Sequence, residues 1–263
     1  MSEQGGRERG EMPFLDHLEE LRWRLIWSLA AVLIGCVIAF FLVDKLDVVG
    51  VLKRPVAPYL AVSGSRLVFT SPTDPILLTF KLALAGGLLL AFPFVGYQVW
   101  GFLSPALFPR ERRAVFPALV AGLVLFICGV LLAYVWVLPL ALKVLFGFQT
   151  EALAPLITAN EYFGFATMVV LAFGAIFELP LVLLLLVYLR ILSADTLSRH
   201  RRLAIVGNAV ISAFLTPADV VSMLLMMLPV QLFYELSIVL ARLLERRRRR
   251  DAARAEGAAA PVA

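Results

Sequence analysis

Long uncharged stretches alternate with short polar segments along this chain. The stretch from Leu25 to Val43 has 19 residues without a charge, and that from Ala114 to Leu142 has 29. Because about 20 apolar residues are enough for a helix to cross a bilayer, the pattern predicts an all-α integral membrane protein. Its six spans are expected at about residues 22–43, 75–101, 114–140, 161–189, 202–216 and 218–241.

The last two predicted spans are short. Leu203 to Ala218 and Val220 to Tyr234 offer 16 and 15 uncharged residues, which at 1.5 Å rise per residue reach roughly 24 Å against a hydrocarbon core of about 30 Å. Between them, Thr216 and Pro217 are typical of a helix N-terminus. The pattern therefore predicts a truncated hairpin.

The polar ends complete the predicted domain organisation. Residues 1–12 are short, polar and rich in glycine, and we expect them to form a disordered cytoplasmic N-terminus. Residues 13–242 form one six-helix membrane domain, and residues 243–263, with the arginine run 246–250, are expected to be a disordered basic cytoplasmic tail.

Composition supports a membrane protein and excludes several classes. The chain is 61% hydrophobic and only 16% charged, whereas about a quarter of residues are charged in soluble domains. It has two cysteines, both within apolar runs, and two histidines, with no phosphate-binding loop motif. We therefore expect no metal site, no cofactor, no enzymatic activity and no nucleic acid partner.

The basic residues predict the orientation. With six spans, 18 of the 24 lysine and arginine residues lie on the side that carries both termini. Cytoplasmic loops of membrane proteins carry such an excess. Both termini are therefore expected to be cytoplasmic, and this orientation also explains the net charge of +5.

The segment Pro13 to Leu25 carries a dense set of charges up to the edge of the first span. Its apolar residues share one helical face, and a mostly acidic collar that includes Glu20 surrounds the rest. The segment is either a solvated, amphipathic entry to the first span or a docking site for a cationic group.

A second carboxylate, Glu111, is predicted on the same side, in the loop from Arg110 to Arg113. Two carboxylates framed by arginines can accept two guanidinium groups through bidentate hydrogen bonds. Alternatively, Glu111 pairs only with its neighbours, an interaction worth about 0–1 kcal/mol in a solvated loop. These residues alone leave both interpretations open.

Glu178 lies deep in the fourth predicted span, where a charge costs roughly 2.5–3.5 kcal/mol on insertion scales. It is expected to face a protein interior or a wet cavity, or to be protonated, and Pro180 can bend the helix beside it. A small proton-coupled secondary transporter that uses Glu178 is the alternative function, although no internal repeat is evident. A structural anchor without a binding site is a third.

Four blocks together resemble TatC, the multispanning component of the twin-arginine protein translocase: HLEELRWRL (17–25), YQVWGFLSPALFPRERR (97–113), AFGAIFELP (172–180) and LTPADVVS (215–222). The resemblance implies six helices in a concave, glove-like wall in the cell membrane of a prokaryote. It also implies recognition, on the cytoplasmic side, of paired-arginine signal peptides on folded cargo, and translocation driven by the protonmotive force.

The resemblance also implies roles for single residues. Glu20 and Glu111 match acidic contacts to the signal-peptide arginines, and the matching positions around them and elsewhere are Arg22, Arg113, Phe102, Pro55, Glu178 and Asp219. The implied partners are TatA-like and TatB-like single-helix proteins, membrane lipid and further copies of the chain. The connection between the last two predicted spans departs from the family pattern, because Ala218 stands where many relatives have a second proline.

Overall fold

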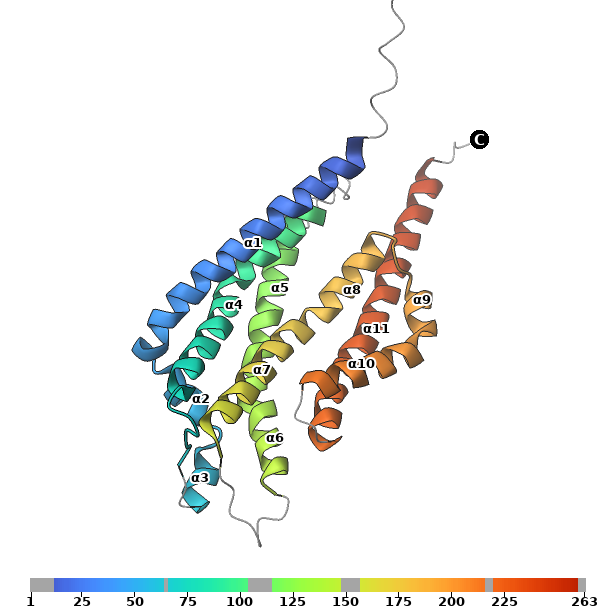
Figure 1. Ribbon diagram of the computed structural model, residues 1–263. Helices are drawn as coiled ribbons and strands as arrows, with labels where there is room; N and C mark the ends of the chain where they lie inside the picture. Colours follow the sequence, from blue (N-terminus) through green and yellow to red (C-terminus); the bar gives the residue numbers. More distant parts are fainter. Residues whose placement is uncertain (1–11, 64–65, 104–114, 148–156, 216–219, 260–263) are drawn as a thin grey trace, which may run out of the picture. The chain divides into compact units, whose positions relative to one another are not determined.

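The computed structural model describes residues 12–63, 66–103, 115–147, 157–215 and 220–259. Within these ranges the chain is helical apart from short connections and one isolated β-bridge, Val68 with Thr158 (Figure 1). Its elements are α1 Met12–Lys45, α2 Val48–Lys53, α3 Ala57–Ser63, α4 Asp74–Leu103, α5 Val115–Leu132, the π-helical turn η3 Ala133–Val137, α6 Leu138–Leu145, α7 Ala159–Phe177, α8 Leu179–Tyr188, α9 Ala194–Arg199, α10 Arg201–Leu215 and α11 Val220–Ala259.

Five stretches of the described helices are long and apolar enough to cross a membrane. They are Asp16–Lys45, Asp74–Phe102, Phe116–Leu145, Ala159–Tyr188 and Met223–Arg248. The remaining predicted span, 202–216, corresponds to α10, which has only 15 residues. The structure therefore confirms an all-helical chain with at least five apolar spans in its described part, and a short α10.

The final helix corrects two expectations. The sequence predicts a short last span and a disordered tail from residue 243, but α11 is one helix of 40 residues that ends at Ala259. Charged residues such as Glu235 and Arg242 shorten the uncharged stretch without ending the helix. Long charged side chains can extend toward water while their backbone stays helical, so the charge pattern underestimated the helix length.

The start of α4 follows the predicted pattern. Pro75 occupies the first turn, where its missing N–H has no intrahelical partner to lose. The buried carboxylate of Asp74 accepts hydrogen bonds from the backbone N–H groups of Thr70 and Ser71 at 2.8 and 2.9 Å. The side chain thus fixes the connection that enters the helix.

The chain divides into two compact units. The first consists of Met1–Val49 and Thr79–Leu123, and the second of Gly50–Leu78 and Val124–Ala263. In the first unit, α1 and α4 approach closely at Gly35 and Gly87. A Cβ atom at Gly87 would lie 2.7 Å from the Cα atom of Cys36, and one at Gly35 would lie 2.7 Å from the carbonyl oxygen of Gly87. Small residues permit such backbone contact between membrane helices.

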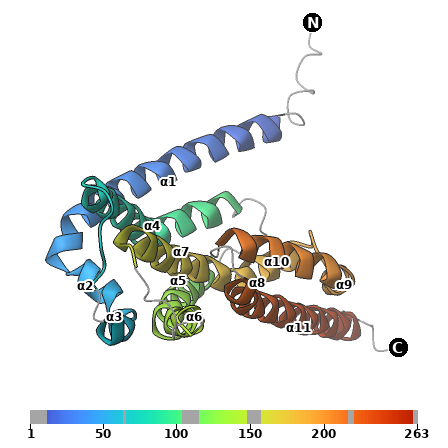
Figure 2. The ribbon, with the colours of Figure 1, turned by 60° about the horizontal axis from the view of Figure 1, so that its bottom comes forward.

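The second unit has an apolar core shared by several helices. Phe173 and Val169 of α7 pack with Met226 and Val230 of α11 in one buried cluster. A second cluster joins the end of α8 to α9 and α11 through Val187, Leu197 and Ile238. Helix α11 packs along both α8 and α10 (Figures 1 and 2), so it is the central support of this unit.

Candidate functional site

Glu20 lies near the beginning of α1, one helical turn before Arg24. Nε of Arg24 donates a hydrogen bond of 2.9 Å to Oε1 of Glu20, and Nη2 of Arg24 bonds to the same oxygen. This spacing of four residues places the two side chains on one face of the helix. The Glu20 side chain remains 32% exposed, so its carboxylate is oriented by a cation and still open to solvent.

His17 connects Glu20 to Phe102. Its Nδ1 atom lies 3.5 Å from Oε2 of Glu20, and its ring stacks on that of Phe102 with the centroids 4.2 Å apart and the planes 9° from parallel. Phe102 is in the last turn of α4. Two residues that the sequence assigned to one site, Glu20 and Phe102, are therefore brought together through a histidine between them.

Arg24 is also held from the side of α4. Its Nη1 atom donates to the backbone and side-chain oxygens of Gln98 at 3.5 and 3.4 Å. A Cβ atom at Gly101 would collide with the Arg24 guanidinium, so the absent side chain makes room for it. The sequence singled out Arg22, which is exposed, whereas Arg24 contacts Glu20.

The sequence analysis did not identify the contacts made by His17 and Arg24. Their contacts with Glu20 could have been predicted, because His17 lies three residues before Glu20 and Arg24 four residues after it, which places the side chains on one face of a helix. No local pattern indicates Gln98, because its contact joins residues 74 positions apart. That part of the site depends on how α1 packs on α4.

Three predicted site residues lie outside the described residues: Glu111, Arg113 and Asp219. Pro55 is described, and it lies in the turn that follows α2 in the second unit, next to the fully buried Val56.

The α2 segment is held by two tyrosines. The hydroxyl of Tyr134 donates to the carbonyl oxygen of Val51 at 2.7 Å, and that of Tyr162 to the carbonyl oxygen of Leu52 at 2.6 Å.

Glu178 stands at the break between α7 and α8, within the apolar span 159–188. The break falls beside Pro180, where the sequence predicted a bend. The proline nitrogen carries no N–H and cannot donate a helical hydrogen bond. Oε1 of Glu178 is buried and has no hydrogen-bond partner among the described residues. A buried carboxyl oxygen without a partner is unfavourable, which marks this position as unusual.

Two polar pairs join α10 to α11. Nη2 of Arg201 lies 2.9 Å from Oε2 of Glu235, and Nδ2 of Asn208 donates to Oε1 of Gln231 at 2.8 Å. Both pairs therefore join side chains of one helix to those of its neighbour.

The described residues offer no metal-binding cluster of three or more His, Cys, Asp or Glu side chains. What they do offer is a set of long apolar helices, a solvent-accessible acidic group at the start of α1 and a buried acidic group within a broken span. The long apolar helices are typical of a multi-pass membrane protein.

Comparison with known proteins gives the family. The family model "Sec-independent protein translocase protein (TatC)" matches residues 16–229. The chain is 40% identical over 240 residues to TatC of Aquifex aeolicus, covering 90% of this chain and 98% of that protein. It is 34% identical over 245 residues to TatC of Desulforapulum autotrophicum, covering 93% and 90%.

Solved structures agree with the sequence relatives. A crystal structure of "Twin Arginine Translocase Receptor TatC" aligns with a TM-score of 0.77 and 40% identity, covering 86% of this chain and 98% of that one. The chain belongs to the TatC family and is a multi-pass protein translocase component of the prokaryotic cell membrane. Family membership does not favour the small-solute transporter considered from the sequence.

Proposed function

We propose that this protein recognises paired-arginine signal peptides on folded cargo through Glu20, and that it nucleates the translocation complex driven by the protonmotive force. The observation that carries the proposal is the arrangement around Glu20. Its carboxylate is held by Arg24, lies next to a stacked pair formed by His17 and Phe102, and remains accessible.

The arrangement suits binding of a guanidinium ion. A carboxylate has two oxygens with about four lone-pair sites, and both Arg24 bonds go to Oε1. Among the residues that the structure describes, Oε2 contacts only His17, at a long distance of 3.5 Å. A carboxylate already fixed in orientation loses less conformational entropy on binding, so a signal-peptide arginine can pair with it at a low entropic cost.

Glu111 supplies the second carboxylate in this proposal. It follows Phe102 by nine residues, and Arg110 and Arg113 stand close to it in the sequence. The resemblance to TatC assigns the same role to it. Two acidic groups on one aqueous face then match two guanidinium groups of the signal.

The topology proposed with this function has six spans in a glove-like arrangement and both termini in the cytoplasm. The short α10 is the fifth span, and the excess of basic residues on the side of the termini supports the orientation. TatA-like and TatB-like single-helix proteins are the proposed partners, together with further copies of the chain. Glu178 acts after docking, in insertion of the signal or in assembly.

The test is site-specific crosslinking of a precursor to the full-length protein in membrane vesicles, with signal peptides that carry either two arginines or two lysines. Lysine is a point charge that cannot match the planar geometry of a bidentate pair. We expect the twin-lysine signal to crosslink roughly tenfold less, equivalent to about 1.4 kcal/mol. Equal crosslinking of the two signals would refute recognition by a carboxylate pair.

A further inference from the structure

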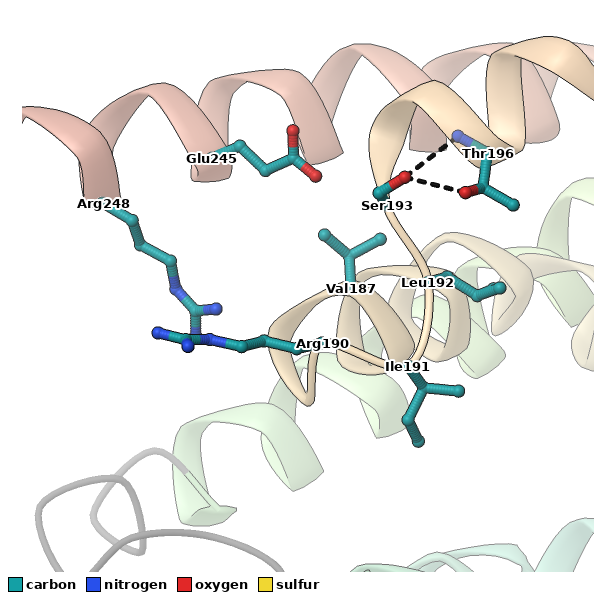
Figure 3. Close-up of a pocket in the computed structure, with 8 residues that line it drawn as sticks. All are labelled: Val187, Arg190, Ile191, Leu192, Ser193, Thr196, Glu245 and Arg248. Atoms are coloured by element: carbon teal, nitrogen blue, oxygen red, sulfur yellow. Dashed lines mark hydrogen bonds between the residues drawn. The ribbon is translucent and has the colours of Figure 1, made fainter.

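A cavity of about 370 Å³ lies in the second unit, between the end of α8, the connection to α9, and α11 (Figure 3). Its size falls within the range of about 300–1,000 Å³ that small-molecule sites occupy. Its wall combines apolar side chains, Val187 and Ile191, with two arginines, Arg190 and Arg248. It is separate from the residues assigned to signal recognition.

The cavity lies where two long helices turn from apolar to basic. The apolar stretch 159–188 ends at Tyr188, α11 is rich in arginine from Arg242 onward, and Tyr188 and Arg248 are in contact beside the cavity. The guanidinium carbon of Arg248 stands 4.3 Å from the centroid of the Tyr188 ring, and its Nη1 atom donates to the Tyr188 carbonyl oxygen at 3.0 Å. Aromatic residues and arginines are typical of the bilayer interface.

The two arginines come from different elements and both line the cavity. Arg190 follows α8 in a left-handed backbone conformation, with φ of 59°, and is exposed. Figure 3 shows the side chains of both residues beside the cavity. An anion bound in the cavity would be attracted by both guanidinium groups.

The other polar groups of the cavity wall are engaged in holding α9. Oε1 of Glu245 accepts a hydrogen bond of 2.9 Å from the backbone N–H of Ala194. Oγ of Ser193 accepts one of 3.0 Å from the backbone N–H of Thr196 and also bonds to the Thr196 hydroxyl. The Glu245 carboxylate is therefore directed to the start of α9, while the arginines are directed to the cavity side shown in Figure 3.

We propose that this cavity binds the phosphate group of an anionic membrane phospholipid. Guanidinium groups form bidentate, charge-assisted hydrogen bonds with phosphate, and basic clusters at the membrane edge attract anionic lipids. Ile191, which is 64% exposed, lies beside the arginines and extends the apolar surface on which an acyl chain packs. A free phosphate ion shares the headgroup chemistry but gains nothing from that apolar surface or from the position at the bilayer edge.

The test is native mass spectrometry of the full-length protein in detergent, titrated with phosphatidylglycerol or phosphatidylcholine. We expect a phosphatidylglycerol adduct that phosphatidylcholine does not form at equal concentration. Arg190→Gln should weaken the adduct about fivefold and Arg190→Gln with Arg248→Gln about 30-fold, at about 1 kcal/mol for each arginine. The matched control is Arg246→Gln with Arg250→Gln, two exposed residues of α11 outside the cavity wall, which should change affinity less than twofold.

Three results would overturn the proposal. The first is an equal loss in the control and in the cavity variants, which would indicate diffuse attraction to the basic helix. The second is wild-type affinity in the Arg190→Gln variant, which removes an exposed side chain and is therefore expected to fold. The third is displacement of the lipid by inorganic phosphate at equal concentration, which would indicate a site for the free ion.

Discussion

Glu20 and Glu178 are two carboxylates in opposite situations. Glu20, in the first unit, is bonded to Arg24, lies near His17 and is partly exposed. Glu178, in the second unit, has one buried oxygen without a hydrogen-bond partner among the described residues. The first group has its charge stabilised before any partner arrives, whereas the second gains a large stabilisation only when a partner or a proton reaches it. The same side chain therefore has very different electrostatic surroundings in the two units.

Removing the charge of Glu20 should have the largest effect on function. Glu20→Gln leaves Arg24 without its ionic partner and replaces the carboxylate that is proposed to bind a signal-peptide arginine with a neutral amide. A hydrogen bond to a charged group contributes about 1.5–3 kcal/mol, so binding of a twin-arginine precursor should weaken at least about tenfold in a vesicle binding assay. Glu19→Gln, an exposed neighbour on the same helix, is the control and should bind as the wild type does. Equal binding by both variants would mean that Glu20 has no special role.

The helix crossing that supports the Glu20 site gives the second prediction. Gly87→Ile introduces a branched side chain where even a Cβ atom would meet the α1 backbone at Cys36. Overpacking of this kind costs about 1–3 kcal/mol, so thermal unfolding in detergent should occur at a lower temperature and signal binding should weaken in parallel. Gly96→Ala is the control, because a Cβ atom there lies 3.9 Å from its nearest neighbour outside the local helix, in Leu119. An unchanged Tm for Gly87→Ile would contradict the close contact.

Replacing Glu178 should separate docking from later steps. In Glu178→Ala we expect precursor binding within about twofold of wild type, a difference of about 0.4 kcal/mol, because Glu178 is proposed to act after docking. We also expect a clear loss of transport into vesicles. The Tm should not fall, because the substitution removes a buried polar atom without a partner. Glu161→Ala, an exposed acid in the first turn of α7, is the control. Unchanged transport in Glu178→Ala would remove this residue from the mechanism.

The pair Arg201 and Glu235 should show the smallest effect. Both side chains are about two-fifths exposed, at 44% and 40%, and exposed ion pairs contribute about 0.2–1 kcal/mol. A double-mutant cycle with Arg201→Gln and Glu235→Gln, measured by thermal unfolding, should give a coupling energy within that range and falling with added salt. A coupling above about 2 kcal/mol would mean that the pair is effectively buried.

Local patterns in the sequence predicted much of this fold. The uncharged runs gave the apolar spans, Pro180 gave the break after Glu178, and the short run 203–218 gave the short α10. Each of these features depends on residues that are neighbours along the chain. The length of α11 was predicted incorrectly, because charge alone does not end a helix.

The site was predicted less completely than the fold. The charge pattern identified Glu20, and the spacing of four residues favours Arg24 over Arg22 as its partner, but the contact of Arg24 with Gln98 joins two helices. The stacking of His17 on Phe102 likewise joins α1 to α4. Such contacts arise from the packing of helices distant in the chain, and single-sequence patterns carry no information about that packing.

The uninterrupted α11 has a mechanical consequence. Its 40 residues measure about 60 Å at 1.5 Å per residue, roughly twice the thickness of the hydrocarbon core. Charged residues are dense from Arg242 onward, so the 18 residues from Arg242 to Ala259 extend about 27 Å beyond the mainly apolar part. A stiff rod of this kind converts a small tilt at its embedded end into a larger sweep at its tip, and a protein attached to that tip would be carried along.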